Sequence, residues 1–158
     1  MRQKGTMTLD TIRSFVAVSE ELGTAGQPTE EQLAAVRSQG FEVVVNLGLL
    51  DPRYCLPDEA RTVAALGMAY HHVPVDFQQP KLADFDAFRG IMRETAGRRV
   101  FVHCAANMRV SCFVALYGET DLDWSREKAD SHVARLWQPN DVWARFLGEV
   151  RSARLGPR

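Results

Sequence analysis

The chain has 158 residues, of which 46% are hydrophobic and 25% charged, and its formal net charge is −1. This length suits one domain whose core needs no disulfide or metal staple, and we expect residues 1–158 to form that domain. A charge so close to neutral gives no general attraction to nucleic acid or to an anionic membrane, so neither is expected as a partner.

Three cysteines, Cys55, Cys104 and Cys112, stand at unrelated spacings. An odd number of cysteines does not suit a disulfide framework and favours a reducing compartment. The stretch M-R-Q-K-G-T-M-T-L-D has no apolar segment typical of a signal peptide, and no window approaches the roughly 20 apolar residues of a membrane span. The sequence therefore predicts a cytoplasmic protein.

Strands and helices are predicted to alternate along the first 100 residues or so. S-F-V-A-V-S over 14–19 predicts a short strand, and Thr29 to Gln32 has the spacing of a capping box that begins a helix. The β-branched run F-E-V-V-V-N-L predicts a strand covered on both faces. A second helix is expected from Pro57-Asp58 to Gly67, followed by the strand M-A-Y-H-H-V-P-V.

The remaining elements follow the same logic. Apolar residues at helical spacing lie between Pro80 and Gly97, and R-V-F-V-H-C predicts the next strand. Three more helices are expected, one around Phe113, one over 125–137 and one capped at Asn140. The pattern indicates an α/β fold with a mainly parallel central sheet of four to five strands and helices on both faces. Ligands of such sheets bind beyond the carboxyl ends of the strands.

Cys104 stands at such an end, in the stretch V-F-V-H-C-A-A-N-M-R-V-S. A strand–loop–helix unit of this kind turns backbone N–H groups toward one point and forms an anion site. The same dipoles favour a thiolate, which is then placed to attack a bound phosphate at phosphorus. An arginine would clamp the phosphoryl oxygens, and an acid on a neighbouring loop would protonate the leaving oxygen.

In this stretch the chain resembles the cysteine-dependent protein tyrosine and dual-specificity phosphatases, whose signature is His-Cys, five residues, Arg, then Ser or Thr. The resemblance runs over roughly residues 14–117, from G-Q-P-T-E-E-Q-L through V-V-V-N-L, L-P-D-E-A and V-P-V-D-F to the loop itself. It is most similar to the compact bacterial branch of the dual-specificity-like fold.

The resemblance implies a role for five side chains: His103 orients the thiolate, Cys104 is the nucleophile, Asp76 is the general acid, Arg109 contacts the phosphate and Ser111 helps the thiolate leave. It also implies a phosphate-binding loop made of Ala105, Ala106, Asn107, Met108, Arg109 and Val110. No cofactor or metal is implied. The expected partner is a phosphorylated small molecule or a phosphoprotein, bound by a monomer or a homodimer.

The loop departs from the family pattern in its spacing. Only four residues separate Cys104 from Arg109, yet Ser111 lies seven residues beyond Cys104, where the family has its Ser or Thr. In one interpretation the loop has standard length, Val110 takes the arginine position, and Asn107 takes a glycine position whose left-handed backbone Asn tolerates. In the other, the loop is one residue short, Arg109 contacts the phosphate and Ser111 is displaced. We favour the first, because Asn107 and Ser111 keep their register.

Several alternatives stay open. Arg98 or Arg99 would compensate for the displaced arginine, Asp84 or Asp86 would replace Asp76 as the acid, and Cys55 would be a redox partner of Cys104. The segment 47–58 either lines the cleft, with Tyr54 as a wall, or is an ordinary connection. The two terminal helices complete the fold or form a dimer face.

Three other interpretations stand beside that of an active phosphatase. The displaced arginine motivates a weakly active or inactive pseudophosphatase that binds phosphate or a phosphorylated partner. A rhodanese-type sulfur carrier also holds a cysteine among backbone donors. A metal site is disfavoured, because His71 and His72 are adjacent on a strand and face opposite ways.

Overall fold

A five-stranded sheet forms the centre of the computed structural model, which describes residues 8–156. The strands lie in the order β1-β2-β5-β3-β4. Their bounds are β1 Val16–Ala17, β2 Leu22–Ala25, β3 Val43–Asn46, β4 Ala69–His72 and β5 Val100–His103. β2, β5, β3 and β4 are parallel neighbours, and only β1 runs antiparallel. The predicted mainly parallel sheet is confirmed.

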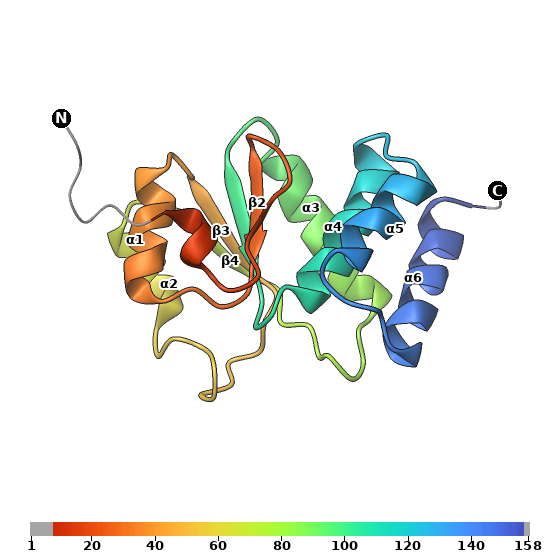
Figure 1. Ribbon diagram of the computed structural model, residues 1–158, viewed down its shortest axis with the longest axis horizontal. Coiled ribbons are helices and arrows are strands. Elements are labelled where there is room, and N and C mark those ends of the chain that lie inside the picture. Colours follow the sequence, from red (N-terminus) through yellow and green to blue (C-terminus); the bar gives the residue numbers. More distant parts are fainter. Residues whose placement is uncertain (1–7, 157–158) are drawn as a thin grey trace.

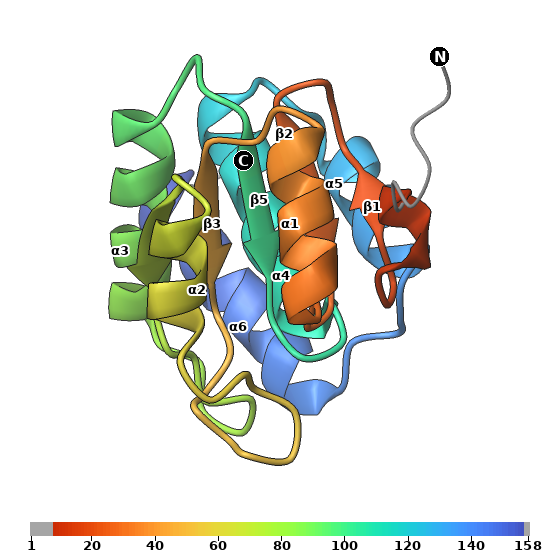
Figure 2. The ribbon, with the colours of Figure 1, turned by 90° about the vertical axis from the view of Figure 1, so that its left-hand side faces the viewer.

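Helices cover both faces of this sheet (Figure 1). They are the 3₁₀ helix η1 Leu9–Thr11 and the α-helices α1 Glu30–Ser38, α2 Glu59–Ala65, α3 Leu82–Glu94, α4 Met108–Asp121, α5 Arg126–Ala134 and α6 Asp141–Arg154. Figure 2 shows α1 and α2 in front of one face, and α3, α4 and α6 lie behind the other. α5 packs against α4.

The strands alternate their side chains between two apolar cores, as buried strands do. Val44 and Phe101 pack into the cluster that α1 and α2 cover. Val43, Val45 and Val102 pack into the larger cluster beneath α3, α4 and α6. β5 lies between β2 and β3, so its carboxyl end emerges at the centre of one edge of the sheet.

Helix starts agree with the sequence. The capping box at Thr29 forms with Gln32, and the side chains of Asp58 and Asn140 cap α2 and α6. The helix predicted over 125–137 ends earlier, at Ala134. None of the helices in residues 8–156 has the length and apolar character required to cross a bilayer.

One strand was missed. L-G-T-A was not predicted to be a strand, but it forms β2, and the strand expected over 14–19 is reduced to β1. Gly23 and Gly26 made this stretch resemble a turn. Glycine is required at these positions by close packing, since a Cβ on Gly23 would lie 3.1 Å from the Phe41 ring.

Three loops leave the carboxyl ends of β3, β4 and β5, over residues 47–58, 73–81 and 104–107. Figure 1 shows all three at the lower edge of the sheet. This edge brings together the segments that the sequence singled out, which are 47–58 with Tyr54, the V-P-V-D-F loop with Asp76, and the loop after Cys104.

Candidate active site

The loop after β5 turns on Asn107. This residue is the N-cap of α4 and has left-handed backbone angles, φ 66° and ψ 9°. The expectation that Asn107 stands where such a conformation is needed is therefore confirmed. Its side chain adds what a glycine could not, because Nδ2 donates to the Ser14 carbonyl at 2.8 Å and to Thr24 Oγ1 at 3.1 Å.

Gly26, just after β2, lets the chain pass close beside this loop. A Cβ on Gly26 would lie 2.5 Å from the carbonyl oxygen of Ala105, so no side chain fits there. The approach allows the backbone N–H of Gln27 to donate to that same carbonyl at 3.0 Å. Loop and strand are thereby fixed to each other.

The loop presents unpaired backbone donors. Among the described residues, the N–H groups of Ala105, Ala106, Met108, Arg109 and Val110 have no hydrogen-bond acceptor. They include the first N–H groups of α4, which no earlier turn can satisfy. Consecutive free donors at a helix amino terminus form an anion-binding site. Cys104, 1% exposed, lies at the base of this loop.

A buried chain of polar groups lies behind Cys104. Nε2 of His103 pairs with Oε2 of Glu59, and Oε1 of Glu59 accepts from Gln27 Nε2 at 2.8 Å. Burial raises the pKa of Glu59, but the hydrogen bond and charge of His103 outweigh it, so the net pKa is lowered. Glu59 is thus an ionised partner that holds the histidine ring.

Glu59 and Gln27 were not identified from the sequence. Glu59 is 44 residues from His103, and an acid in the first turn of a helix is ordinary because it complements the helix dipole. The only available signal was their position inside the quoted matches L-P-D-E-A and G-Q-P-T-E-E-Q-L.

The guanidinium of Arg109 is buried and reaches the loop that carries Asp76. Nη1 donates to the Val75 carbonyl at 2.9 Å, and Nη2 lies 3.5 Å from the Tyr54 hydroxyl. Its central carbon is 5.9 Å from the ring centre of Tyr54 and 5.9 Å from that of Phe77. Arg109 thus lies between the 47–58 segment and the Asp76 loop, within range of a cation–π contact with each ring.

Asp76 is exposed, between two anchored neighbours. The N–H of Val75 donates to the Leu47 carbonyl at 3.0 Å. On the other side, Nε1 of Trp143 donates to the Phe77 carbonyl at 2.8 Å, and the Phe77 ring packs 5.6 Å from Trp137. The terminal helix α6 and the residues before it therefore complete the fold and support the Asp76 loop.

Ser111 makes its contacts elsewhere. Its hydroxyl donates to the Met108 carbonyl at 2.6 Å and accepts from Trp137 Nε1 at 3.0 Å. Within residues 8–156 it has no hydrogen bond to Cys104. The helix explains this, because residues two apart point about 200° away from each other, so Arg109 and Ser111 face different sides of α4. The role of Ser111 stays a prediction.

Arg98 and Arg99 do not compensate for the position of Arg109. They precede β5, so they lie at the opposite end of that strand from Cys104, about 13 Å away for four extended residues. Arg99 instead donates to the Glu20 carbonyl at 2.7 Å and lies over the Phe41 ring. The suggestion that either arginine serves the site is wrong.

The other two candidate acids have structural partners. Oδ2 of Asp84 accepts from the Lys81 N–H at 3.0 Å at the start of α3, and Asp86 pairs with Arg154 at 2.6 Å. Cys112 is a core residue of α4, and burial raises the pKa of its thiol to about 12. Asp76 has a local contact too, because its Oδ1 accepts from the Gln78 N–H at 2.9 Å, but of the three candidate acids it is the one whose loop Arg109 contacts.

Known proteins share this architecture. Residues 15–139 match the model of a family described as DSP-PTPase phosphatase fused to NAD+ kinase. The crystal structure of a DUF442 protein of Shewanella putrefaciens CN-32, described as a phosphatase candidate, is 31% identical with a TM-score of 0.83 and covers 92% of this chain and 96% of that one. Tk-PTP in its active form shares the fold, at 20% identity and a TM-score of 0.75, over 88% of this chain and 97% of that one.

Curated relatives match over the same region. A beta-lactamase hydrolase-like protein of Agrobacterium fabrum is 31% identical over 118 residues, which are 73% of this chain and 27% of that protein. One of Xylella fastidiosa is 29% identical over 120 residues, 74% of this chain and 28% of that protein. This chain spans about a quarter of the length of these relatives. On the match over residues 15–139, the chain belongs to the DSP-PTPase phosphatase family, and the resemblance drawn from its loop is confirmed.

Proposed function

We propose that this chain hydrolyses phosphomonoesters through a phospho-cysteine intermediate. The observation that carries the proposal is the run of free N–H groups between Ala105 and Val110, directly beyond Cys104. A dianionic phosphoryl group bound there would be held by donors that need no rearrangement during the reaction. Membership of a phosphatase family supports the same reading.

The proposed chemistry has two steps. The thiolate of Cys104 attacks phosphorus, a sulfur–phosphorus bond forms, the ester P–O bond breaks, and Asp76 gives its proton to the leaving oxygen. Water then attacks phosphorus while the Asp76 carboxylate accepts its proton. The sulfur–phosphorus bond breaks, and inorganic phosphate and the thiolate are released.

In this proposal Arg109 is the phosphate clamp, which corresponds to the interpretation of a loop one residue short. Its guanidinium already lies beside the Asp76 loop, 2.9 Å from the Val75 carbonyl. Val110, by contrast, is fully buried in the core under α4. A bidentate guanidinium suits the equatorial oxygens of a transferring phosphoryl group.

The substrate is proposed to be a phosphorylated small molecule or a phosphoprotein, met by a monomer or a homodimer. In this proposal the segment 47–58 contacts the leaving group of the substrate. Leu49 and Leu50 are exposed there, and the Tyr54 hydroxyl holds the segment by accepting from the Leu49 N–H at 2.9 Å. The free thiols of Cys55, Cys104 and Cys112 suit the reducing cytoplasm that we propose as its compartment.

Turnover of para-nitrophenyl phosphate at about pH 6, with Cys104→Ser and the loop control Cys55→Ser alongside, tests the proposal. We expect turnover in the parent and in Cys55→Ser, and none in Cys104→Ser. An inactive parent whose melting temperature still rises with vanadate would be a binding module. An inactive parent that transfers sulfur to cyanide would be of rhodanese type.

A further inference from the structure

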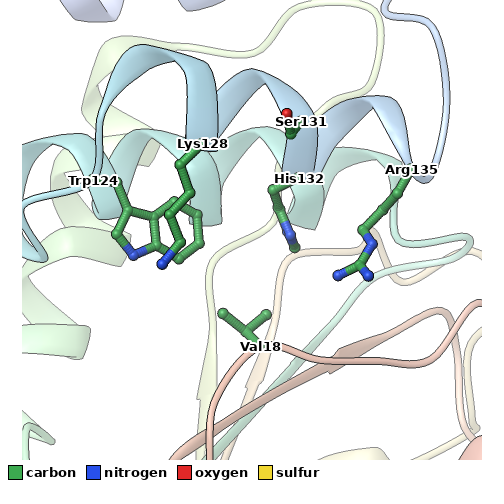
Figure 3. Close-up of a pocket in the computed structure, with 6 residues that line it drawn as sticks. All are labelled: Val18, Trp124, Lys128, Ser131, His132 and Arg135. Carbon is green, nitrogen blue, oxygen red and sulfur yellow. The ribbon is translucent and has the colours of Figure 1, made fainter.

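A cavity lies between α5 and the end of β1, away from the loop that follows Cys104 (Figure 3). It has a volume of about 290 Å³. Its lining residues are Val18, Trp124, Lys128, Ser131, His132 and Arg135. That volume is near the lower limit of small-molecule sites, so it suits a small ligand.

His132 lines this cavity and carries a ring nitrogen without a hydrogen-bond partner in the described residues. The residue is only 7% exposed, and its Nε2 is buried without a hydrogen-bond partner in the part of the chain that the structure describes. Its ring packs edge-on against Trp124 at 5.8 Å, and Figure 3 shows it extending from α5 toward Val18. A buried nitrogen without a hydrogen-bond partner costs free energy, so binding a ligand that provides the missing partner is favoured.

Two cations face the same space. Arg135 extends from α5 on the same side as His132, and Lys128 Nζ lies 4.8 Å from the Trp124 ring centre. Neither has an ion pair among residues 8–156, whereas the nearby Arg126 and Arg151 both pair with Glu119. No acidic residue lines the cavity. The lining therefore carries two cationic side chains that form no ion pair within residues 8–156.

The protonation of His132 fits a hydrogen-bonding rather than a charged role. Burial, and then the charge of Arg135, lower its pKa to about 4. At neutral pH the ring is uncharged, and the tautomer with the proton on Nε2 carries one N–H donor that has no acceptor within residues 8–156.

We propose that this cavity is a second oxyanion site, which binds a small tetrahedral dianion of the phosphate or sulfate type. Arg135 supplies a fork of N–H donors, Lys128 supplies a point charge, and His132 Nε2–H supplies a buried donor that fixes the anion's position. The rigid face of Trp124 holds Lys128 in place through their cation–π contact.

The site is separate from the proposed catalytic centre. Val18 belongs to the β1–β2 turn, level with Leu22 and the start of β5, whereas Cys104 follows the opposite end of β5. Trp124 follows the carboxyl end of α4, whose 14 residues span about 20 Å from the loop. The two sites share no residue, so anion binding here does not depend on the proposed phosphatase activity.

Histidine side-chain NMR of the whole chain tests the proposal. Proton–nitrogen spectra are recorded while sodium phosphate or sodium sulfate is added, with sodium chloride at equal ionic strength as the reference, and His132→Gln assigns the His132 signal. We expect phosphate or sulfate to shift His132 Nε2 saturably and chloride not to do so.

Matched charge variants locate the anion. Lys128→Gln with Arg135→Gln should abolish the saturable shift, whereas Arg145→Gln, an exposed arginine of α6, should leave it unchanged. A shift equal to that in chloride, an unsaturable shift, or a shift that survives the double substitution would overturn the proposal. All three exchanged residues are exposed, so folding is retained, and circular dichroism checks this.

Discussion

Arg109 Nη1 donates to the carbonyl of Val75, 2.9 Å away, and Val75 is the residue immediately before Asp76. One hydrogen bond thus connects the start of α4 with the loop of the proposed acid. Because the same guanidinium also lies 3.5 Å from the Tyr54 hydroxyl, Arg109 links all three loops at the carboxyl edge of the sheet.

Arg109→Lys should lower kcat for para-nitrophenyl phosphate by about 100- to 1,000-fold, because lysine keeps the charge but loses the bidentate fork. Initial rates over a range of substrate concentration separate this loss from a change in KM. The swap Arg109→Ala with Val110→Arg tests the other interpretation of the loop. We expect no rescue, since Val110 is fully buried. Rescue by the swap would place the clamp at Val110 instead.

Asp76→Asn should slow hydrolysis of phosphotyrosine by about 100-fold or more, because the poor leaving group needs the proton. The loss should be smaller with para-nitrophenyl phosphate, whose leaving group departs more easily without an acid. Asp84→Asn is the matched control, because that carboxylate accepts from the Lys81 N–H and caps α3. Equal effects of Asp76→Asn on both substrates would contradict the role of acid.

Glu59→Ala should destabilise the fold by about 3 kcal/mol at neutral pH, because it leaves His103 buried without its partner. The folded pKa of Glu59 is lowered, so this stability is fully present above the unfolded pKa and is lost as pH falls through the folded pKa. Urea unfolding at neutral and acidic pH measures the difference from the parent, with exposed Glu149→Ala as control. A difference independent of pH would show that the charge of Glu59 does not matter.

Many of the strands and helix starts could be predicted from the local sequence. The β-branched run of β3, the run before Cys104 and the capping box at Thr29 each act through neighbouring residues, so each was identified correctly. The left-handed backbone of Asn107 could also be predicted, because Asn is one of the few residues other than glycine that tolerate it.

The misses concern residues whose partners are distant in sequence. Gly26 is explained by its approach to Ala105, and Glu59 by its pair with His103, and neither contact leaves a local pattern. Counting residues also does not show in which directions the side chains of Arg109 and Ser111 point. A helix turns about 100° per residue, so register in the sequence does not set direction in space.

Gly26→Ala should destabilise the protein by about 1–3 kcal/mol and abolish turnover, because the new Cβ would meet the Ala105 carbonyl at 2.5 Å and push the loop out of place. Gly90→Ala, inside α3, is the matched control. Nothing lies within 4 Å of its new Cβ, so the substitution should stabilise the helix by about 0.5–1 kcal/mol. Thermal unfolding and para-nitrophenyl phosphate turnover measure both variants. A fully active Gly26→Ala variant would contradict the proposed fit.

His132 should make the fold sensitive to mild acid. Its folded pKa of about 4 lies below the ordinary 6.5, because of burial and then the charge of Arg135, while Lys128 is the other cation facing it across the cavity. A depressed histidine pKa means that the unfolded chain binds the proton more readily, so stability is lost as pH falls below the unfolded value. Linkage gives a loss of about 2 kcal/mol between pH 7 and pH 5 from this residue.

The measurement is urea unfolding of the parent and His132→Gln at both pH values, in chloride without phosphate or sulfate. His71→Gln, a half-buried histidine of β4, is the control. The parent and the control should lose about 2 kcal/mol more than His132→Gln on acidification. An equal loss in all three proteins would mean that His132 takes up its proton in the folded state as easily as in the unfolded one, and that its burial carries no cost.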